Sequence, residues 1–205
     1  MWVSEESKVV YLALPKTASK TVASWLQGET GCVCIPRGQR KWDTHHECQP
    51  ITNEHQYFVF TTVRNPYARF VSRFKQSQRY KTDRKYFIDF VRSIRPNHFK
   101  KFSSIRGPNH AGKLVLNPPI ALPQVRYIDT WQVNFTNTIS ITYQEKLMSS
   151  LASLPFVRRD IKLPLLGKHD NIPWQFFYDD KSIVIKIRDL YQEDFERFGY
   201  SEKIE

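Results

Sequence analysis

The first apolar run of the chain ends abruptly in a loop of lysines and hydroxyl residues. Residues 8–14 have the composition of a buried strand, and they are followed by Pro15-Lys16-Thr17-Ala18-Ser19-Lys20-Thr21. Apolar positions in residues 17–27 are then spaced for a helix that packs back on the strand. A strand-loop-helix junction gathers backbone N–H groups at the positive end of the helix. This feature predicts a phosphate-binding loop within an α/β unit.

A second junction of the same kind follows. Residues 57–63 form another apolar run, which ends at Arg64, and Asn65 and Pro66 are typical of the cap and first turn of a helix. A guanidinium group binds phosphate through two parallel N–H donors, and Ser72 lies on the polar face of the next helix. Two anion sites predict a ligand with two phosphates.

The rest of the chain continues the alternation of strands and helices. Residues 137–142 predict a third strand, and helices are expected over residues 86–94, 144–154 and 180–198, the last ending at Gly199. Residues 28–56 and 95–125 are irregular. We therefore expect one domain over residues 1–205, with a P-loop-like three-layer α/β fold in which helices flank a central parallel sheet.

The composition favours a folded protein with polyanionic partners. Lysine and arginine number 31 against 20 aspartates and glutamates, a formal net charge of +11, and the 14 Phe, 10 Tyr and 5 Trp argue against a disordered basic tail. A phosphorylated cofactor, an acidic glycan, nucleic acid or an anionic membrane would each suit this charge. No apolar run is long enough to span a membrane, and the early first strand leaves no room for a signal peptide, so we expect a cytoplasmic protein. A catalytic fragment of a secretory-pathway enzyme is the alternative.

The first loop imitates the nucleoside triphosphate P-loop only at its end. Ser19-Lys20-Thr21 matches the last three positions of G-x-x-x-x-G-K-[ST], but Leu14 and Ser19 stand where both glycines belong. This mismatch argues against nucleoside triphosphate as the ligand. An ordinary turn with solvated lysines is the alternative for the loop alone, and Arg64 with Ser72 shifts the balance toward an anion site.

Together, residues 14–21 and 63–72 resemble the two cofactor signatures of sulfotransferases that use 3′-phosphoadenosine 5′-phosphosulfate (PAPS). Residues 163–168, 176–178 and 191–200 resemble the C-terminal region of the carbohydrate branch of that family, which includes Golgi-type, heparan-sulfate-like and bacterial enzymes. The resemblance implies in-line transfer of a sulfuryl group from PAPS to a hydroxyl on an acidic or neutral glycan. The product would be 3′-phosphoadenosine 5′-phosphate (PAP), and no metal would be needed.

The resemblance also implies roles for individual residues. In-line transfer leaves negative charge on the oxygen that bridges to the departing 5′-phosphate, and Lys16 is the cation expected there. The remaining loop residues would hold the 5′-phosphate, and Arg64 with Ser72 would hold the 3′-phosphate. Those loop residues are Thr17, Ala18, Ser19, Lys20 and Thr21, of which Lys20 stands where the family often has Ser or Thr.

A candidate base lies just upstream of the second strand. Related carbohydrate sulfotransferases commonly carry a histidine base in this region, and here His45 and His46 share that role. Asp43 and Glu47 are possible orienting groups or alternative bases. The alternative is a surface histidine pair in a polar loop.

Three cysteines flank these histidines without a familiar zinc spacing. Cys32, Cys34 and Cys48 are better interpreted as free thiols, or as one disulfide between Cys48 and either upstream cysteine, than as zinc ligands.

A basic stretch with interspersed aromatic residues runs from Lys75 to Arg106. It is typical of a solvated helix face, and the alternative is a groove for an anionic acceptor. For the whole chain, the alternative function is a basic nucleotide- or nucleic-acid-binding module without sulfuryl transfer. A third possibility is a family member that binds the cofactor but lacks a competent base.

Overall fold

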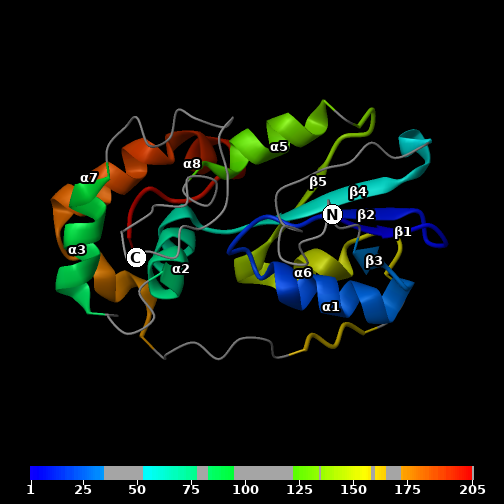
Figure 1. The fold of residues 1–205 in the computed structure, drawn as a ribbon, viewed down its shortest axis with the longest axis horizontal. Helices are drawn as coiled ribbons and strands as arrows, with labels where there is room; N and C mark the ends of the chain where they lie inside the picture. Colours follow the sequence, from blue (N-terminus) through cyan, green and yellow to red (C-terminus); the bar gives the residue numbers. More distant parts are fainter. Residues whose placement is uncertain are drawn as a thin grey trace, which may run out of the picture. The chain divides into compact units, whose positions relative to one another are not determined.

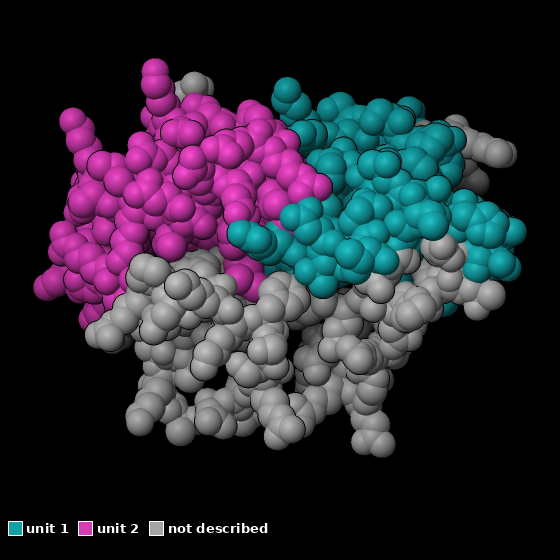
Figure 2. Space-filling view, turned by 90° about the horizontal axis from the view of Figure 1, so that it is seen from above, with its two compact units in different colours: residues 1–64, 126–170 teal, residues 65–125, 171–205 magenta. Residues whose placement is uncertain are grey.

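The computed structural model describes residues 1–34, 53–77, 83–94, 122–133, 135–157, 160–164 and 172–204. The chain divides into two compact units, which Figure 2 colours separately: residues 1–64 with 126–170, and residues 65–125 with 171–205. The first unit holds a mixed α/β arrangement, and the second is built from helices among its described residues (Figure 1). The single-domain assignment stays a prediction.

The first unit is built on a five-stranded sheet of order β3-β1-β2-β4-β5. Its three predicted strands pair in parallel, β2 with β4 and β4 with β5, which confirms the expected parallel sheet flanked by helices. Two further strands, β1 and β3, extend the sheet in the antiparallel sense. These two were not predicted, because strands of two or three residues are too short to show periodicity. The strands are β1 (Trp2–Ser4), β2 (Val9–Leu12), β3 (Val33–Cys34), β4 (Phe58–Val63) and β5 (Ser140–Tyr143).

The register of the parallel strands determines where their loops emerge. Leu12 of β2 lies opposite Thr61 of β4, and Thr61 lies opposite Ile141 of β5. Parallel strands present their carboxyl ends at one edge of the sheet. The loop that follows β2 and the residue that follows β4, Arg64, therefore leave the sheet at the same edge.

Helices cover this sheet because its central strands are apolar on both faces. Figure 1 shows α1 (Ser19–Thr30) and α6 (Leu147–Ala152) on one side of the sheet and α5 (Gln124–Gln132) on the other. Short 3₁₀ turns, η1 (Glu54–Gln56) and η3 (Gln144–Lys146), precede β4 and α6. One buried cluster joins the sheet to α1 and α6; its members include Val9, Tyr11, Phe60, Val22, Trp25, Leu26 and Leu151.

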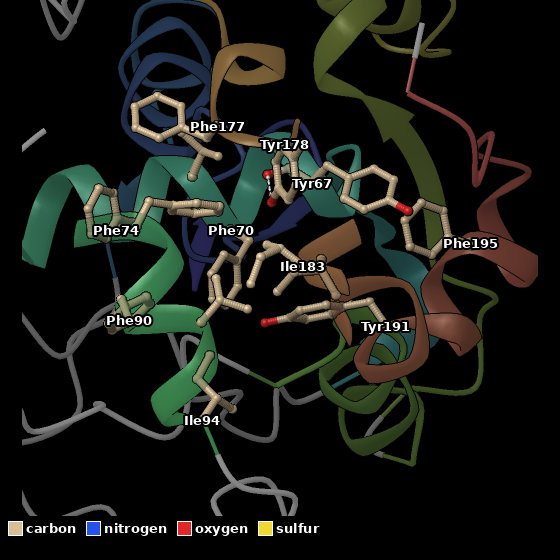
Figure 3. Close-up of a cluster of buried hydrophobic side chains, with 14 residues drawn as sticks. Tyr67, Phe70, Phe74, Phe90, Ile94, Phe177, Tyr178, Ile183, Tyr191 and Phe195 are labelled. Atoms are coloured by element: carbon tan, nitrogen blue, oxygen red, sulfur yellow. Dashed lines mark hydrogen bonds between the residues drawn. The ribbon is translucent and has the colours of Figure 1, made fainter. Parts of the chain in front are cut away.

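The second unit has an aromatic core. Its elements are α2 (Pro66–Ser77), α3 (Arg84–Ser93), η4 (Trp174–Phe177), α7 (Lys181–Leu190) and α8 (Gln192–Phe198). The predicted apolar face of α2, Tyr67-Phe70-Val71-Phe74, is buried in this core, as Figure 3 shows for its aromatic members. The Phe70 and Phe87 rings meet edge to face at 5.9 Å, and the Tyr178 hydroxyl donates to the Tyr67 carbonyl at 3.0 Å.

The predicted final helix is two helices instead of one. The backbone leaves the helical region at Tyr191 (φ −122°, ψ 21°), and α8 begins at the next residue. The apolar stripe nevertheless holds on both sides of the break, since Ile187, Tyr191 and Phe195 are all buried in the aromatic core. The predicted end at Gly199 is confirmed, with the glycine in the left-handed conformation (φ 67°).

A buried carboxylate on α8 caps the start of α5. Asp194 is fully buried and accepts hydrogen bonds from the backbone N–H groups of Gln124 and Val125, both at 2.9 Å, and from the Gln124 side chain at 3.2 Å. Burial raises the pKa of Asp194, while the Arg69 guanidinium and these hydrogen bonds oppose the rise. Arg69 is itself buried and donates to the Leu122 carbonyl at 2.9 Å.

We expect Asp194→Ala to lower the free energy of unfolding by about 2–4 kcal/mol. The variant leaves two backbone donors without their acceptor and removes the negative charge that interacts with the buried Arg69 guanidinium. Urea denaturation measures the change. Asp189→Ala is the matched control, because Asp189 forms only an exposed pair with Arg188 and should change stability by about 0.5 kcal/mol or less. Equal effects of the two variants would contradict the assigned role of Asp194.

Candidate functional site

The loop between β2 and α1 adopts a phosphate-binding type of backbone without glycine. Lys16 (φ 68°) and Ala18 (φ 62°) are both in the left-handed region, on either side of Thr17. A residue with a β-carbon is strained there by about 1–2 kcal/mol. Left-handed residues within a turn direct successive N–H groups into one concavity, where an anion binds. Missing glycines in the sequence therefore do not exclude such a loop.

Two hydrogen bonds hold this backbone. The Thr17 hydroxyl donates to the Leu14 carbonyl at 3.0 Å, and the Val22 N–H donates to the Ala18 carbonyl at 3.1 Å. Thr17 is completely buried, so its hydroxyl points into the protein, and the residue can offer an anion only its backbone N–H.

The N-terminus of α1 favours an anionic ligand. Ala18 precedes the helix and provides no side-chain cap, and the first turn contains no acidic residue. The N–H groups of a first turn have no acceptor within the helix, and the helix end is partly positive. Lys20 is exposed in that turn and Lys16 is half-buried just before it. Two cations beside a positive helix end attract an anion, so this donor set fits phosphate or sulfate.

The N-terminus of α2 is different, because the chain caps it. The Asn65 side-chain oxygen accepts from the N–H groups of Tyr67 at 2.9 Å and Ala68 at 3.3 Å. Pro66 has no N–H to satisfy. This arrangement confirms the predicted cap. It also means that the first N–H groups of α2 already have an acceptor within the protein.

Arg64 connects the two junctions directly. Its Nη1 donates to the Lys16 carbonyl at 3.3 Å, across 48 positions of sequence. This contact brings the cation that follows β4 to the left-handed turn that follows β2. Lys16 and Arg64, one residue from each predicted signature, therefore lie at the same edge of the sheet.

The other predicted residues are placed as follows. Ser19 is buried, Thr21 is half-buried, and Ser72 is half-buried on α2 of the second unit. The pairing of Arg64 with Ser72 stays a prediction. His45 and His46 lie outside the described residues.

A buried group of hydroxyl residues lies under the loop, and the sequence reasoning missed it. Thr62 of β4 and Thr142 of β5 are paired through their hydroxyls at 2.9 Å, and Thr142 also donates to the Thr61 carbonyl at 3.1 Å. Tyr11 of β2 is completely buried beside them. Burial raises the pKa of Tyr11 well above its ordinary value, and the hydroxyls of Thr62 and Thr17 lie near its own. The sequence signal from which this group could have been predicted is the pair of threonines near the carboxyl end of the otherwise apolar β4.

Few of the residues considered as thiols or as metal ligands lie in the described part of the chain. Cys32 is a buried free thiol whose sulfur accepts from the Thr30 hydroxyl at 3.1 Å, and burial raises the pKa of that thiol. Cys48 lies outside the described residues. Within the described part of the chain, no group of three or more histidine, cysteine, aspartate or glutamate residues is arranged to hold a metal ion. Nor does any helix of that part have the length and apolarity required to cross a membrane.

Cations of the basic stretch bind partners within the second unit. Lys75 donates to the Ile172 carbonyl at 2.9 Å, Arg84 lies 2.5 Å from Asp179, and Arg92 lies 3.2 Å from Asp180. Each contact joins α2 or α3 to the segment around η4 and α7. For these three residues a structural role is favoured over a groove for an anionic acceptor.

A mixed α/β fold whose parallel strands end at a left-handed loop and a helix N-terminus defines the P-loop-like class. A comparison with protein-family models identifies the group within that class, because the model described as the sulfotransferase family matches residues 1–114. The match covers more than half of the chain and both junctions, so the chain belongs to the sulfotransferase family. Its reaction class is accordingly sulfuryl transfer. No curated protein and no solved structure matched the chain.

The left-handed conformation of Ala18 leads to a stability prediction. We expect Ala18→Gly to raise the free energy of unfolding by up to about 1 kcal/mol, because glycine adopts positive φ without strain, and Ala18→Val to lower it by about 1–2 kcal/mol. Thermal denaturation measures both changes. The control Ala152→Gly, at an exposed helical position of α6, should instead be destabilising by up to about 1 kcal/mol. The same sign at positions 18 and 152 would contradict the assigned backbone strain.

Proposed function

We propose that this protein transfers a sulfuryl group from PAPS to a hydroxyl group of a carbohydrate. The observation that carries the proposal is the hydrogen bond from Arg64 to the Lys16 carbonyl, which joins the two junctions at the uncapped N-terminus of α1. A ligand with phosphates at two separated positions could place one phosphate at each junction.

The loop residues would bind the 5′-phosphate through different groups. The backbone N–H groups of residues 17–21 belong to the loop and to the first turn of α1, where they would donate to the phosphate. The Lys20 ammonium adds positive charge from an exposed position in that turn. Thr17 contributes through its backbone, since its hydroxyl is bonded to the Leu14 carbonyl. Arg64 and Ser72 would hold the 3′-phosphate through charge-assisted and hydroxyl hydrogen bonds.

Lys16 is the candidate catalytic cation. When bound, PAPS supplies the sulfuryl group and a 5′-phosphate leaving group whose bridging oxygen gains negative charge. Lys16 lies in the left-handed turn directly before α1 and is half-buried, where an ammonium interacts with developing charge more strongly than in bulk water. His45 or His46 would accept the proton of the acceptor hydroxyl.

The acceptor is proposed to be an acidic or neutral glycan. The family resemblance supports a carbohydrate, and the net charge of +11 suits an acidic one. Lys75, Arg84 and Arg92 already have partners within the second unit, so selectivity for a sulfated chain would depend on other cations.

PAP binding tests the cofactor assignment. We expect saturable binding of one PAP per chain by calorimetry, weakened about 10- to 100-fold by Arg64→Ala because charge-assisted hydrogen bonds are lost. Lys146→Ala, an exposed cation in the same unit, is the control and should bind PAP like the wild type. Tighter binding of ATP with Mg²⁺, or of oligonucleotides with a steep salt dependence, would instead support the nucleotide- or nucleic-acid-binding alternative.

Sulfuryl transfer from labelled PAPS to a glycan panel tests the chemistry. Lys16→Ala should reduce turnover about 10²- to 10³-fold, the cost of losing one group that stabilises transition-state charge, while PAP affinity falls less. Lys146→Ala again serves as the control. A Lys16→Ala enzyme with normal turnover would remove Lys16 from the mechanism.

The histidine pair is tested by the variants His45→Ala, His46→Ala and their combination. Loss of a general base should lower turnover about 10²- to 10⁴-fold while PAP binding is retained. A double variant with unchanged turnover would exclude both histidines, and the single variants identify which one acts.

A further inference from the structure

Tyr11 is a fully buried polar residue on the strand that leads into the phosphate-binding loop. It lies on β2 with no exposed surface, and its ring stacks on Phe60 of the neighbouring strand at 4.9 Å. Its hydroxyl makes no hydrogen bond of standard geometry to any described residue. Leaving a buried hydroxyl in that state destabilises a protein, so packing alone would be served better by phenylalanine.

The hydrogen bonds around Tyr11 determine what its hydroxyl can do. Thr17 donates its single hydroxyl hydrogen to the Leu14 carbonyl. Thr142 donates its own to the Thr61 carbonyl, so in the pair of threonine hydroxyls Thr62 must be the donor. Both neighbours of Tyr11 have therefore used their hydrogens and retain only lone pairs. Tyr11 can only donate to them, and its one hydrogen serves either Thr62 of the sheet or Thr17 of the loop.

Thr17 is the position through which such a bond would control the loop. It lies between Lys16 and Ala18, the two residues in the left-handed conformation. A strained backbone of this kind persists only when surrounding contacts over-determine it. A bond from the sheet to Thr17 would fix the turn on both sides of it at once.

We propose that Tyr11 is a positioning residue of the phosphate-binding loop, whose hydroxyl donates to Thr17 Oγ1 when an anion is bound. The hydroxyl then stabilises the anion-bound form of the loop, whereas in this structure it makes no hydrogen bond of standard geometry to a described residue. Tyr11 does not touch the anion itself, since its side chain has no exposed surface. The inference rests on the proposed function only in the choice of PAP as the first probe.

The test is Tyr11→Phe, with Tyr57→Phe as the matched control. Tyr57 is a second buried tyrosine of the same unit, and its hydroxyl is hydrogen-bonded to Glu5, away from the loop. We expect Tyr11→Phe to bind PAP about three- to tenfold more weakly, the range of one neutral hydrogen bond, while its melting temperature without PAP equals or exceeds that of the wild type. Tyr57→Phe should show the reverse: unchanged PAP affinity and a lower melting temperature.

Hydrogen exchange measures an effect that a purely structural role of Tyr11 would not produce. With PAP bound, amides of residues 13–22 should exchange faster in Tyr11→Phe than in the wild type, while amides of β4 remain equally protected. Unchanged affinity and exchange in Tyr11→Phe would overturn the inference. A fall in melting temperature that accounts for the whole loss of affinity would also overturn it, because it would indicate a structural role.

Inorganic pyrophosphate separates this inference from the proposed function. If the wild type binds pyrophosphate but not PAP, the PAPS assignment fails, and the Tyr11→Phe comparison is made with pyrophosphate. If pyrophosphate binds both proteins equally, the Tyr11 inference fails. A wild type that binds neither ligand overturns both.

Discussion

The parallel pairing of β2 with β4 is the constraint on which the candidate site depends. With Leu12 opposite Thr61, the segments that follow the two strands leave the sheet at the same edge. Arg64 can therefore reach the Lys16 carbonyl, although the two residues are 48 positions apart in the sequence. A shift of register by one residue would turn the buried side chains of β4 to the opposite face and move Arg64 away from the loop.

The two helices that follow these strands differ in how their N-termini are satisfied. Asn65 caps α2 with its own side chain, so that helix end is complete within the protein. The first turn of α1 has no side-chain cap, no acidic residue and a strained left-handed turn before it. Uncapped N–H groups and backbone strain both reduce stability, and both are concentrated at the loop that is proposed to hold the 5′-phosphate. The buried hydroxyl of Tyr11 under the same loop adds a third local cost of this kind.

Much of the fold could be predicted because long apolar segments have clear periodicity. Strands β2, β4 and β5, the helix after Asn65 and the helix end at Gly199 were all expected from spacing and caps. Strands β1 and β3 are too short for periodicity to reveal them. The break at Tyr191 was missed because the apolar stripe runs through it unchanged. Likewise, the net charge of +11 suggested anionic partners, yet Lys75, Arg84 and Arg92 bind carbonyls and carboxylates of their own unit.

The sequence by itself determined the chemistry available to this protein: two strand ends that carry Lys16 and Arg64, each followed by a helix, in a pattern that led to the sulfotransferase family. Local spacing is sufficient for this, because a strand, its loop and the next helix are consecutive in the chain. Only the tertiary structure decided which groups meet. The bond from Arg64 to Lys16 and the burial of Tyr11 beside Phe60 depend on how separate strands pair, and pairing brings together residues that no short stretch of sequence contains. The left-handed turn is a property of the folded backbone that a sequence without glycine does not indicate.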